Sequence, residues 1–281
     1  MLFVLLVGAY LALSVGAVRD ALTSAFHRTL PRALAAPVVL WLASLVYLRL
    51  AGLSVGARAG PFAAYLVLPA LVVASGRTPT GRPPVRELAA AVLFWLPIEF
   101  HLLPTLPLPI AGGYNAVPFL ALVEGLYLFL IVRRLDGVGY TFLLTWRDVR
   151  LAVTAFGAFA IIAIPLGLAT RFLAWNPDVR PWSVFVRPIL IYLVTAVPEE
   201  FLFRGLIQNL LTRWLGAPRA LPMAAVIFGL AHFPDPRYIL LATLAGFAYG
   251  WTYLRTGKVT ASAVTHALVD GVWVAVLRVS Q

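Results

Sequence analysis

The chain has 281 residues, of which 62% are hydrophobic and only 12% are charged, and it contains no Cys. Soluble domains have about 45–50% apolar and about 25% charged residues, so this composition excludes an ordinary soluble enzyme, and it also excludes a disordered chain. The lack of Cys excludes a disulfide framework. Because a bilayer offers no water to the backbone and the apolar runs do not alternate, the sequence predicts an all-α fold, a polytopic transmembrane helical bundle.

The net charge is +11, with 22 Lys and Arg against 11 Asp and Glu. The basic residues lie between the apolar runs and do not form one stripe, which argues against a nucleic-acid partner. Arg side chains at helix ends reach phosphate headgroups. We therefore expect the basic residues to contact the lipid bilayer, and we expect no nucleic-acid partner.

About 20 apolar residues cross a bilayer as a helix. On that measure we expect about eight to ten hydrophobic segments that form transmembrane helices. The runs are Leu2–Val18, Ala33–Leu53, Pro61–Ser75, Leu88–Leu103, Ala116–Val132, Leu151–Ala169, Pro188–Leu215, Leu221–Phe233, Tyr238–Leu254 and Val259–Leu277.

A break in the hydrophobic pattern at Arg133–Arg150 divides the chain in two. Residues 1–135 are expected to form N-terminal transmembrane helices of unassigned role, and residues 136–281 carry the polar motifs. Within the break, Tyr140–Arg150 mixes aromatic and basic residues, which predicts a helix lying in the membrane interface.

The first polar motif contains Pro198, Glu199, Glu200 and Arg204 within an apolar run. An ionisable residue inside the membrane is costly and is therefore a functional candidate. Glu200 and Arg204 are four residues apart, so we expect them to share a helix face and form an ion pair. Glu199 points about 100° away and is left free to face a wet cavity as a general base. Pro198 is expected to kink the helix or start a new one; the alternative for the whole motif is an ion pair that only fixes helix packing.

The second motif pairs Phe228 with His232, and the third pairs His266 with Asp270, each four residues apart. Gly229 allows close approach of a neighbouring helix. A His beside an aromatic residue is more often packed structure than a catalyst, and this alternative stays open for His232. Asp270 could orient the His266 imidazole, or the two could satisfy each other between helices.

Together the motifs supply two Glu, two His and one Asp. This set can activate water, because a carboxylate can take the proton while imidazoles polarise a carbonyl or stabilise its oxyanion. The same set could bind zinc, with Glu199, His232, His266 and Asp270 as candidate ligands. A serine hydrolase is unsupported, because no nucleophile elbow surrounds Ser262.

The order and spacing of these motifs resemble the three-motif signature of the CPBP (Abi) family of intramembrane proteases, which includes the type II CAAX prenyl proteases. The resemblance covers roughly residues 182–277 and implies a protease core within residues 136–281, built around a membrane-embedded polar cavity. It implies that Glu199 activates water with help from His232. It also implies that Glu200 and Arg204 are structural partners of this base.

The resemblance further implies an oxyanion-stabilising role for His266 and Asp270. In the prenyl proteases, however, the third motif often ends in Asn, and an ionised Asp cannot donate a hydrogen bond to an oxyanion. Asp270 is therefore expected to be protonated, to orient His266, or to bind a metal.

The implied activity is hydrolysis of a peptide bond near the C-terminal tail of a membrane-anchored or lipidated protein. A glutamate-dependent reaction requires no cofactor, whereas a metalloprotease would use zinc. The resemblance implies a multi-pass integral protein, which we expect in a prokaryotic cytoplasmic membrane.

Two other functional classes stay open. The protein could be a non-catalytic membrane scaffold or immunity protein, or a proton-coupled transporter, since intramembrane Glu, His and Arg also suit proton relays. A transporter should show matching halves, and the first half has no counterpart of the Glu199–Arg204 cluster. In that half we interpret Glu99, His101 and Glu124 as interhelical hydrogen-bonding or cavity-lining residues. The sequence makes no prediction of oligomeric state.

Overall fold

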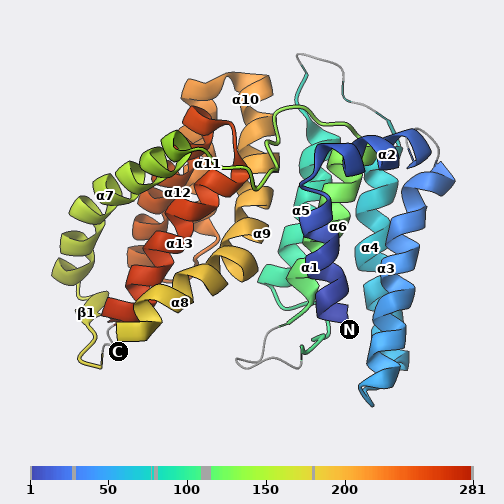
Figure 1. The fold of residues 1–281 in the computed structure, drawn as a ribbon, viewed down its shortest axis with the longest axis horizontal. Coiled ribbons are helices and arrows are strands. Elements are labelled where there is room, and N and C mark those ends of the chain that lie inside the picture. The colour runs from blue at the N-terminus through green and yellow to red at the C-terminus, as the bar shows by residue number, and fades with distance from the viewer. Residues whose placement is uncertain are drawn as a thin grey trace. The chain divides into compact units, whose positions relative to one another are not determined.

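A computed structural model of the chain describes residues 2–26, 30–76, 78, 82–108, 115–178 and 181–279. The described residues are nearly all helical (Figure 1), as the composition predicts. The chain divides into two compact units, residues 1–136 and 137–281. This division lies one residue from the boundary that the sequence predicts.

The N-terminal unit, residues 1–136, consists of helices in its described part. They are α1 (Leu2–Ala12), α2 (Gly16–Phe26), α3 (Leu30–Leu50), α4 (Gly56–Ala74), α5 (Val85–Glu99), α6 (Val117–Leu126) and the π-helix η1 (Tyr127–Val132). The axes of α1 and α2 meet at an angle of 97°.

The polar residues of this unit make mostly local contacts. Glu99 accepts a hydrogen bond from Trp95 Nε1 (3.1 Å) on its own helix, and the His101 ring lies 3.1 Å from the Glu99 carbonyl. The hydrogen-bonding contacts of Glu99 and His101 are therefore local and not interhelical, and the alternative that they line a cavity stays a prediction. The Glu124 carboxyl is fully buried and has no hydrogen-bond partner among the described residues.

The C-terminal unit, residues 137–281, holds nine helical elements and two short strands among its described residues. They are α7 (Trp146–Ala169), β1 (Leu173–Trp175), α8 (Pro181–Ile191), η2 (Tyr192–Ala196), α9 (Val197–Glu200), η3 (Phe201–Gln208), α10 (Asn209–Leu215), α11 (Ala217–Leu230), α12 (Pro236–Thr256), α13 (Val259–Val276) and β2 (Leu277–Val279).

All ten predicted segments coincide with one or more of these helices. Four helices in the described part are long and apolar enough to cross a bilayer, and a fifth span results if the bent pair α1 and α2 is counted as one. The four are Ala33–Leu50 within α3, α4, α7 and α13. The protein is therefore a multi-pass integral membrane protein with an all-α fold.

The chain from Pro181 to Leu215 is continuously helical and changes its hydrogen-bond pattern several times. The α-helical turn at Val197–Glu200 lies between the π-helical turns η2 and η3. Ala196 and Val197 both have helical backbone angles, so a new helix start at Pro198 is not seen. Because Pro lacks the N–H that an α-helix would use, a local change of register accommodates it.

The expected interfacial helix at Tyr140–Arg150 is only partly present. Residues 140–145 are not helical, and α7 begins after Thr145 in a capping box, in which Thr145 Oγ1 accepts from the Asp148 backbone and Asp148 Oδ2 accepts from Thr145 N (2.8 Å). Lys258 Nζ bonds the same carboxylate at 2.7 Å. The capping box fixes the start of the helix, so Trp146–Arg150 is simply the first turn of an apolar helix.

Small residues bring α11 and α12 close together, as predicted at Gly229. A Cβ atom on Gly229 would lie 1.9 Å from Thr243 Oγ1, and one on Gly246 would lie 2.9 Å from Ala225 Cα. Any larger side chain at these positions would push the two helices apart.

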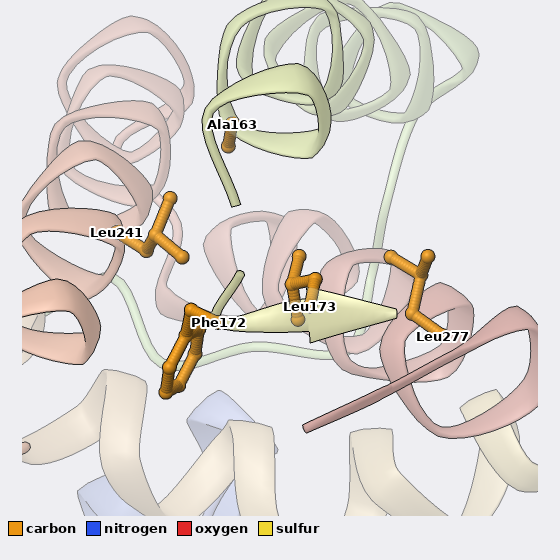
Figure 2. Close-up of a cluster of buried hydrophobic side chains, with 5 residues drawn as sticks. All are labelled: Ala163, Phe172, Leu173, Leu241 and Leu277. Carbon is orange, nitrogen blue, oxygen red and sulfur yellow. The ribbon is translucent and has the colours of Figure 1, made fainter. Parts of the chain in front are cut away.

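A hydrophobic cluster joins the far ends of α7 and α13 (Figure 2). Its buried members are Ala163, Phe172, Leu173, Leu241 and Leu277. The strands β1 and β2 pair antiparallel beside it, with Leu173 opposite Val279. Neither strand was predicted, because three residues carry too little pattern to distinguish a strand from a loop. The pair fixes the end of α13, the helix that carries the third motif.

Candidate active site

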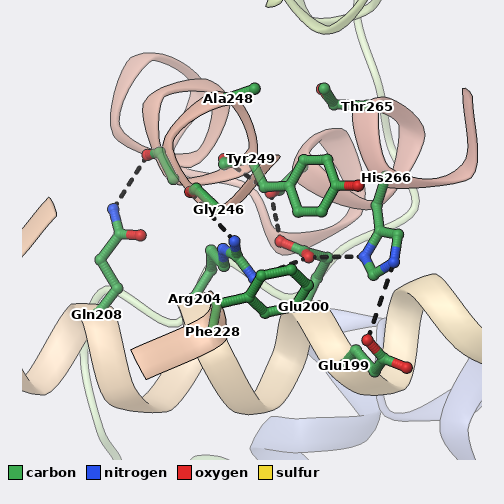
Figure 3. A network of polar contacts seen from close by, with 12 residues as sticks. Glu199, Glu200, Arg204, Gln208, Phe228, Gly246, Ala248, Tyr249, Thr265 and His266 are labelled. Carbon is green, nitrogen blue, oxygen red and sulfur yellow. Dashed lines mark hydrogen bonds and ion pairs between the residues drawn. The ribbon is translucent and has the colours of Figure 1, made fainter. Parts of the chain in front are cut away.

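The three sequence motifs meet inside the C-terminal unit (Figure 3). Glu199 and Glu200 lie on α9, and Arg204 follows on η3. Phe228 lies on α11, whereas His232 lies just beyond the end of that helix. His266 and Asp270 lie on α13; this list of positions accounts for every site residue that the sequence predicts.

Glu200 is the most heavily bonded group of the site. Its side chain is fully buried, and Oε1 accepts from Arg204 NH1 at 3.0 Å, which is the predicted ion pair. The same oxygen accepts from His266 Nδ1 at 2.8 Å, and Oε2 accepts from Ser262 Oγ at 2.5 Å. A buried carboxylate with this many donors is fixed in place.

The Arg204 guanidinium contacts two aromatic rings in addition to the Glu200 carboxylate. Its guanidinium carbon lies 4.4 Å from the centroid of the Phe228 ring and 5.0 Å from that of Tyr249. Arg204 NH2 also donates to the Gly246 carbonyl at 3.2 Å. The aromatic residue of the second motif therefore supports the cation of the first motif through a desolvated cation–π contact.

Glu199 differs sharply from its neighbour Glu200. The side chain of Glu199 is 40% exposed, and its nearest ion-pair partner is His266 Nε2, which lies 3.8 Å from Oε2. That distance is too long for a hydrogen bond. One carboxylate of the Glu-Glu pair is thus buried in fixed contacts, while the other is open to a cavity.

His266 has a carboxylate beside each of its ring nitrogens. Nδ1 faces Glu200 Oε1, whereas Nε2 lies 3.4 Å from Asp270 Oδ2. The Tyr249 ring stacks on the imidazole with centroids 4.5 Å apart. The predicted contact with Asp270 is present at the cavity-side nitrogen, and the shorter contact to Glu200 on α9, which the spacing did not predict, holds Nδ1.

His232 is oriented by its own motif. Its Nδ1 lies 2.8 Å from the Phe228 carbonyl, which can only accept, so Nδ1 carries the proton. In the neutral ring Nε2 is then the acceptor. The His232 ring also contacts Phe228 and Tyr238, with centroids 4.8 and 4.5 Å away.

The loop after His232 leads into α12. Asp235 caps this helix by accepting from the Arg237 backbone at 2.8 Å. The hydrogen bonds from the Arg237 guanidinium lower the pKa of Asp235 to about 2. Asp235 is therefore ionised at neutral pH, and the turn beside the site keeps its geometry.

A cavity of about 280 Å³ lies among these groups. Its polar lining is Thr195, Glu199, His232, Tyr238, Tyr249, His266 and Asp270. The four residues predicted to be catalytic all line this cavity, as does Phe228. Glu200 and Arg204 do not line it. The site therefore has a space large enough for water, an open carboxylate and two imidazoles.

Residues 181–272 match the family described as Type II CAAX prenyl endopeptidase Rce1-like. The matched range, about a third of the chain, contains all three motifs and every polar residue of the cavity. The Rce1-like match indicates protease activity of the CAAX type for this membrane protein. Comparisons with curated proteins and with solved structures found no match.

The donors of this cavity are also the candidate ligands of a zinc ion. No group of three or more His, Asp and Glu side chains in the described part of the chain is arranged to hold a metal ion. Glu200 occupies His266 Nδ1, whereas Nε2 faces the cavity. Zinc dependence therefore stays a prediction.

Three residues of the Rce1-like site escaped the sequence analysis, and a fourth, Ser262, was considered only as a nucleophile. Thr195, Tyr238 and Tyr249 line the cavity, and Ser262 binds Glu200. Thr195 lies four residues before Glu199 and Ser262 lies four before His266, so helical spacing could have indicated both. The two Tyr residues come from α12, which has no polar motif that would have drawn attention to them.

Proposed function

We propose that the protein is an intramembrane endopeptidase that hydrolyses a peptide bond near the C-terminal tail of a membrane-anchored or lipidated protein, with Glu199 as the base that activates water. The contrast between Glu199 and Glu200 carries this proposal. Glu200 is buried in contacts with Arg204, His266 and Ser262, whereas Glu199 opens onto the cavity. An open carboxylate beside a fixed and charged neighbour is suited to proton transfer.

In the proposed reaction a cavity water attacks the carbonyl carbon of the scissile bond. A new C–O bond forms, the π electrons of the carbonyl move to its oxygen, and Glu199 takes a proton from the water. His232 Nε2, as an acceptor, helps to hold that water. Collapse of the intermediate breaks the C–N bond, and Glu199 returns the proton to the departing amine.

His266 contributes through its charge and position. An imidazole with carboxylates at both nitrogens can donate from both only as the imidazolium, which places positive charge beside the developing oxyanion. Asp270, as the acceptor at Nε2, is a positioning group in this scheme. Glu200 and Arg204 fix His266 and keep α9 and α13 in register.

The test uses the purified full chain reconstituted in liposomes with a panel of lipidated and membrane-anchored peptides, and mass spectrometry to detect cleavage. Glu199→Gln should lower cleavage by about 10²-fold or more, as expected for the loss of a positioned base, and should leave thermal unfolding unchanged. Glu99→Gln, which alters a carboxylate of the N-terminal unit, is the matched control and should cleave normally. Equal cleavage by Glu199→Gln would remove this residue from the reaction.

The scaffold or immunity alternative makes the opposite prediction. If the wild-type protein cleaves no peptide of the panel while Glu199→Gln retains its cellular phenotype, the motifs serve structure only. A transporter is less well supported, because it should show matching halves, and the sequence of residues 1–135 has no counterpart of the Glu199–Arg204 cluster.

A further inference from the structure

Tyr238 lines the cavity, and no step proposed above uses it. Its ring lies among three aromatic groups: the centroids are 4.5 Å from His232, 5.4 Å from Phe172 and 5.5 Å from Trp273. Tyr238 also stands in the first turn of α12, which Asp235 caps. The ring is therefore held by packing on several sides and by a fixed helix start.

The hydroxyl of Tyr238, in contrast to its ring, is not engaged. No described residue forms a hydrogen bond with it, and the side chain is half-buried. Tyr238 lines the same cavity as Glu199 and Asp270. A rigidly held donor thus faces the space in which the substrate has to react.

The carboxylates and imidazoles of the cavity do not supply such a hydrogen-bond donor. Glu199 and Asp270, when ionised, can only accept, and the Nδ1 proton of His232 is committed to the Phe228 carbonyl. The protons of His266 are directed at carboxylates. None of these groups has an uncommitted N–H or O–H for the oxygen of a scissile carbonyl.

Two other hydroxyls line the cavity, and both are less suitable. Tyr249 is only 1% exposed and is covered by the stacked ring of His266. Thr195 precedes Glu199 by one turn on the same helix, so it lies on the side from which the activated water would approach. Tyr238 comes from another helix and stands beside His232.

We propose that the Tyr238 hydroxyl donates a hydrogen bond to the oxygen of the scissile carbonyl as that oxygen becomes an oxyanion. The phenol keeps its proton throughout. Proton transfer stays between water, Glu199 and the leaving amine, so the atoms balance as described above. This inference rests on the proposed peptidase function and gives the cavity the donor that Asp270 does not supply.

The direct test is Tyr238→Phe, which removes the hydroxyl and preserves the ring packing. We expect kcat to fall by about 10²-fold to 10³-fold, as for loss of one oxyanion donor, with KM within about twofold because the interaction forms only in the transition state. Thermal unfolding should be unchanged. An unchanged kcat would overturn the inference.

Tyr253→Phe is a matched control on the same helix. Tyr253 lies about 22 Å along α12 from Tyr238 at 1.5 Å per residue, and its hydroxyl donates to the Gly137 carbonyl. This variant should show the reverse pattern, with lower thermal stability and an unchanged kcat. Thr195→Val tests the competing hydroxyl, and a loss of kcat there in place of Tyr238→Phe would also overturn the inference.

A second readout separates the donor role from a structural one. Replacing Tyr238 with fluorotyrosines strengthens the phenol as a donor without changing the fold, so kcat at a pH where the phenol stays protonated should change systematically with the number of fluorine atoms. A flat series would contradict the proposal. The two proposals fail separately: absent cleavage by the wild-type protein removes the peptidase function, whereas normal cleavage by Tyr238→Phe removes only the role of Tyr238.

Discussion

His266 Nδ1 lies 2.8 Å from Glu200 Oε1, and this contact joins the third sequence motif to the first. Glu200 forms an ion pair with Arg204, four residues further along the same helical segment. Glu200 therefore also sets the orientation of the His266 imidazole on α13. A single buried carboxylate therefore connects the cation, the imidazole and the Ser262 hydroxyl. Disturbing it should affect both stability and catalysis.

Arg204→Ala should destabilise the protein by about 3–5 kcal/mol, because it leaves Glu200 charged and without its cation in a dry environment. The measurement is unfolding of the detergent-solubilised protein by heat or denaturant. In a double-mutant cycle, Glu200→Ala with Arg204→Ala should cost less than the sum of the two single changes, because the double variant buries no unpaired charge.

The exposed pair Arg237 and Asp235 provides the comparison for this cycle. Exposed ion pairs contribute little, so Arg237→Gln should change stability far less than Arg204→Ala. Equal stability of Arg204→Ala and the wild-type protein would show that Glu200 does not depend on this cation.

Asp270→Asn tests the acid that stands where the prenyl proteases often have Asn. Asp270 Oδ2 faces His266 Nε2 at 3.4 Å, and an amide oxygen is a weaker acceptor for the imidazolium than a carboxylate. We expect cleavage to fall by about tenfold to a hundredfold, with KM little changed. Higher or unchanged activity would mean that position 270 acts as a hydrogen-bond donor to the substrate, contrary to the scheme above.

Gly229→Ala should destabilise the C-terminal unit by about 1–3 kcal/mol, the usual cost of overpacking. The new Cβ would lie 1.9 Å from Thr243 Oγ1 and 2.8 Å from the Ile239 carbonyl, so α11 and α12 must separate. Gly157→Ala on α7 is the control, because no atom lies within 4 Å of its added Cβ. That variant should gain about 0.5–1 kcal/mol from helix propensity, and a similar response of the two variants would argue against close packing at Gly229.

Much of the helical architecture was predictable, because long apolar runs have few alternatives to helices in a bilayer. The start of α7 was readable as well, since Thr145 and Asp148 have capping-box spacing. The π-helical turns around Pro198 and the pairing of β1 with β2 were not, because each depends on contacts with distant parts of the chain. Local sequence carries no signal for such contacts.

The candidate site likewise has one contact that the sequence predicts and another that it does not. The Glu200–Arg204 pair followed from spacing along one helix, and it is present. The Glu200–His266 contact did not, because it joins two helices whose relative rotation depends on packing. One such packing point is Gly271, where an added Cβ would lie 2.7 Å from Pro188 Cγ. Sequence spacing alone therefore assigned the orientation of His266 to Asp270, its neighbour on the helix.

Metal content is the remaining test, because the motifs also suggested zinc. With no metal-binding trio among the described residues, we expect the purified protein to hold well under one zinc per chain. Cleavage should then persist after dialysis against a strong chelator, and added zinc should not raise it. Elemental analysis and the peptide assay on the same preparation provide both readouts. Loss of cleavage on chelation and its return with zinc would establish a metalloprotease, and Glu199 would then have to act as a ligand or as the base of a metal-bound water.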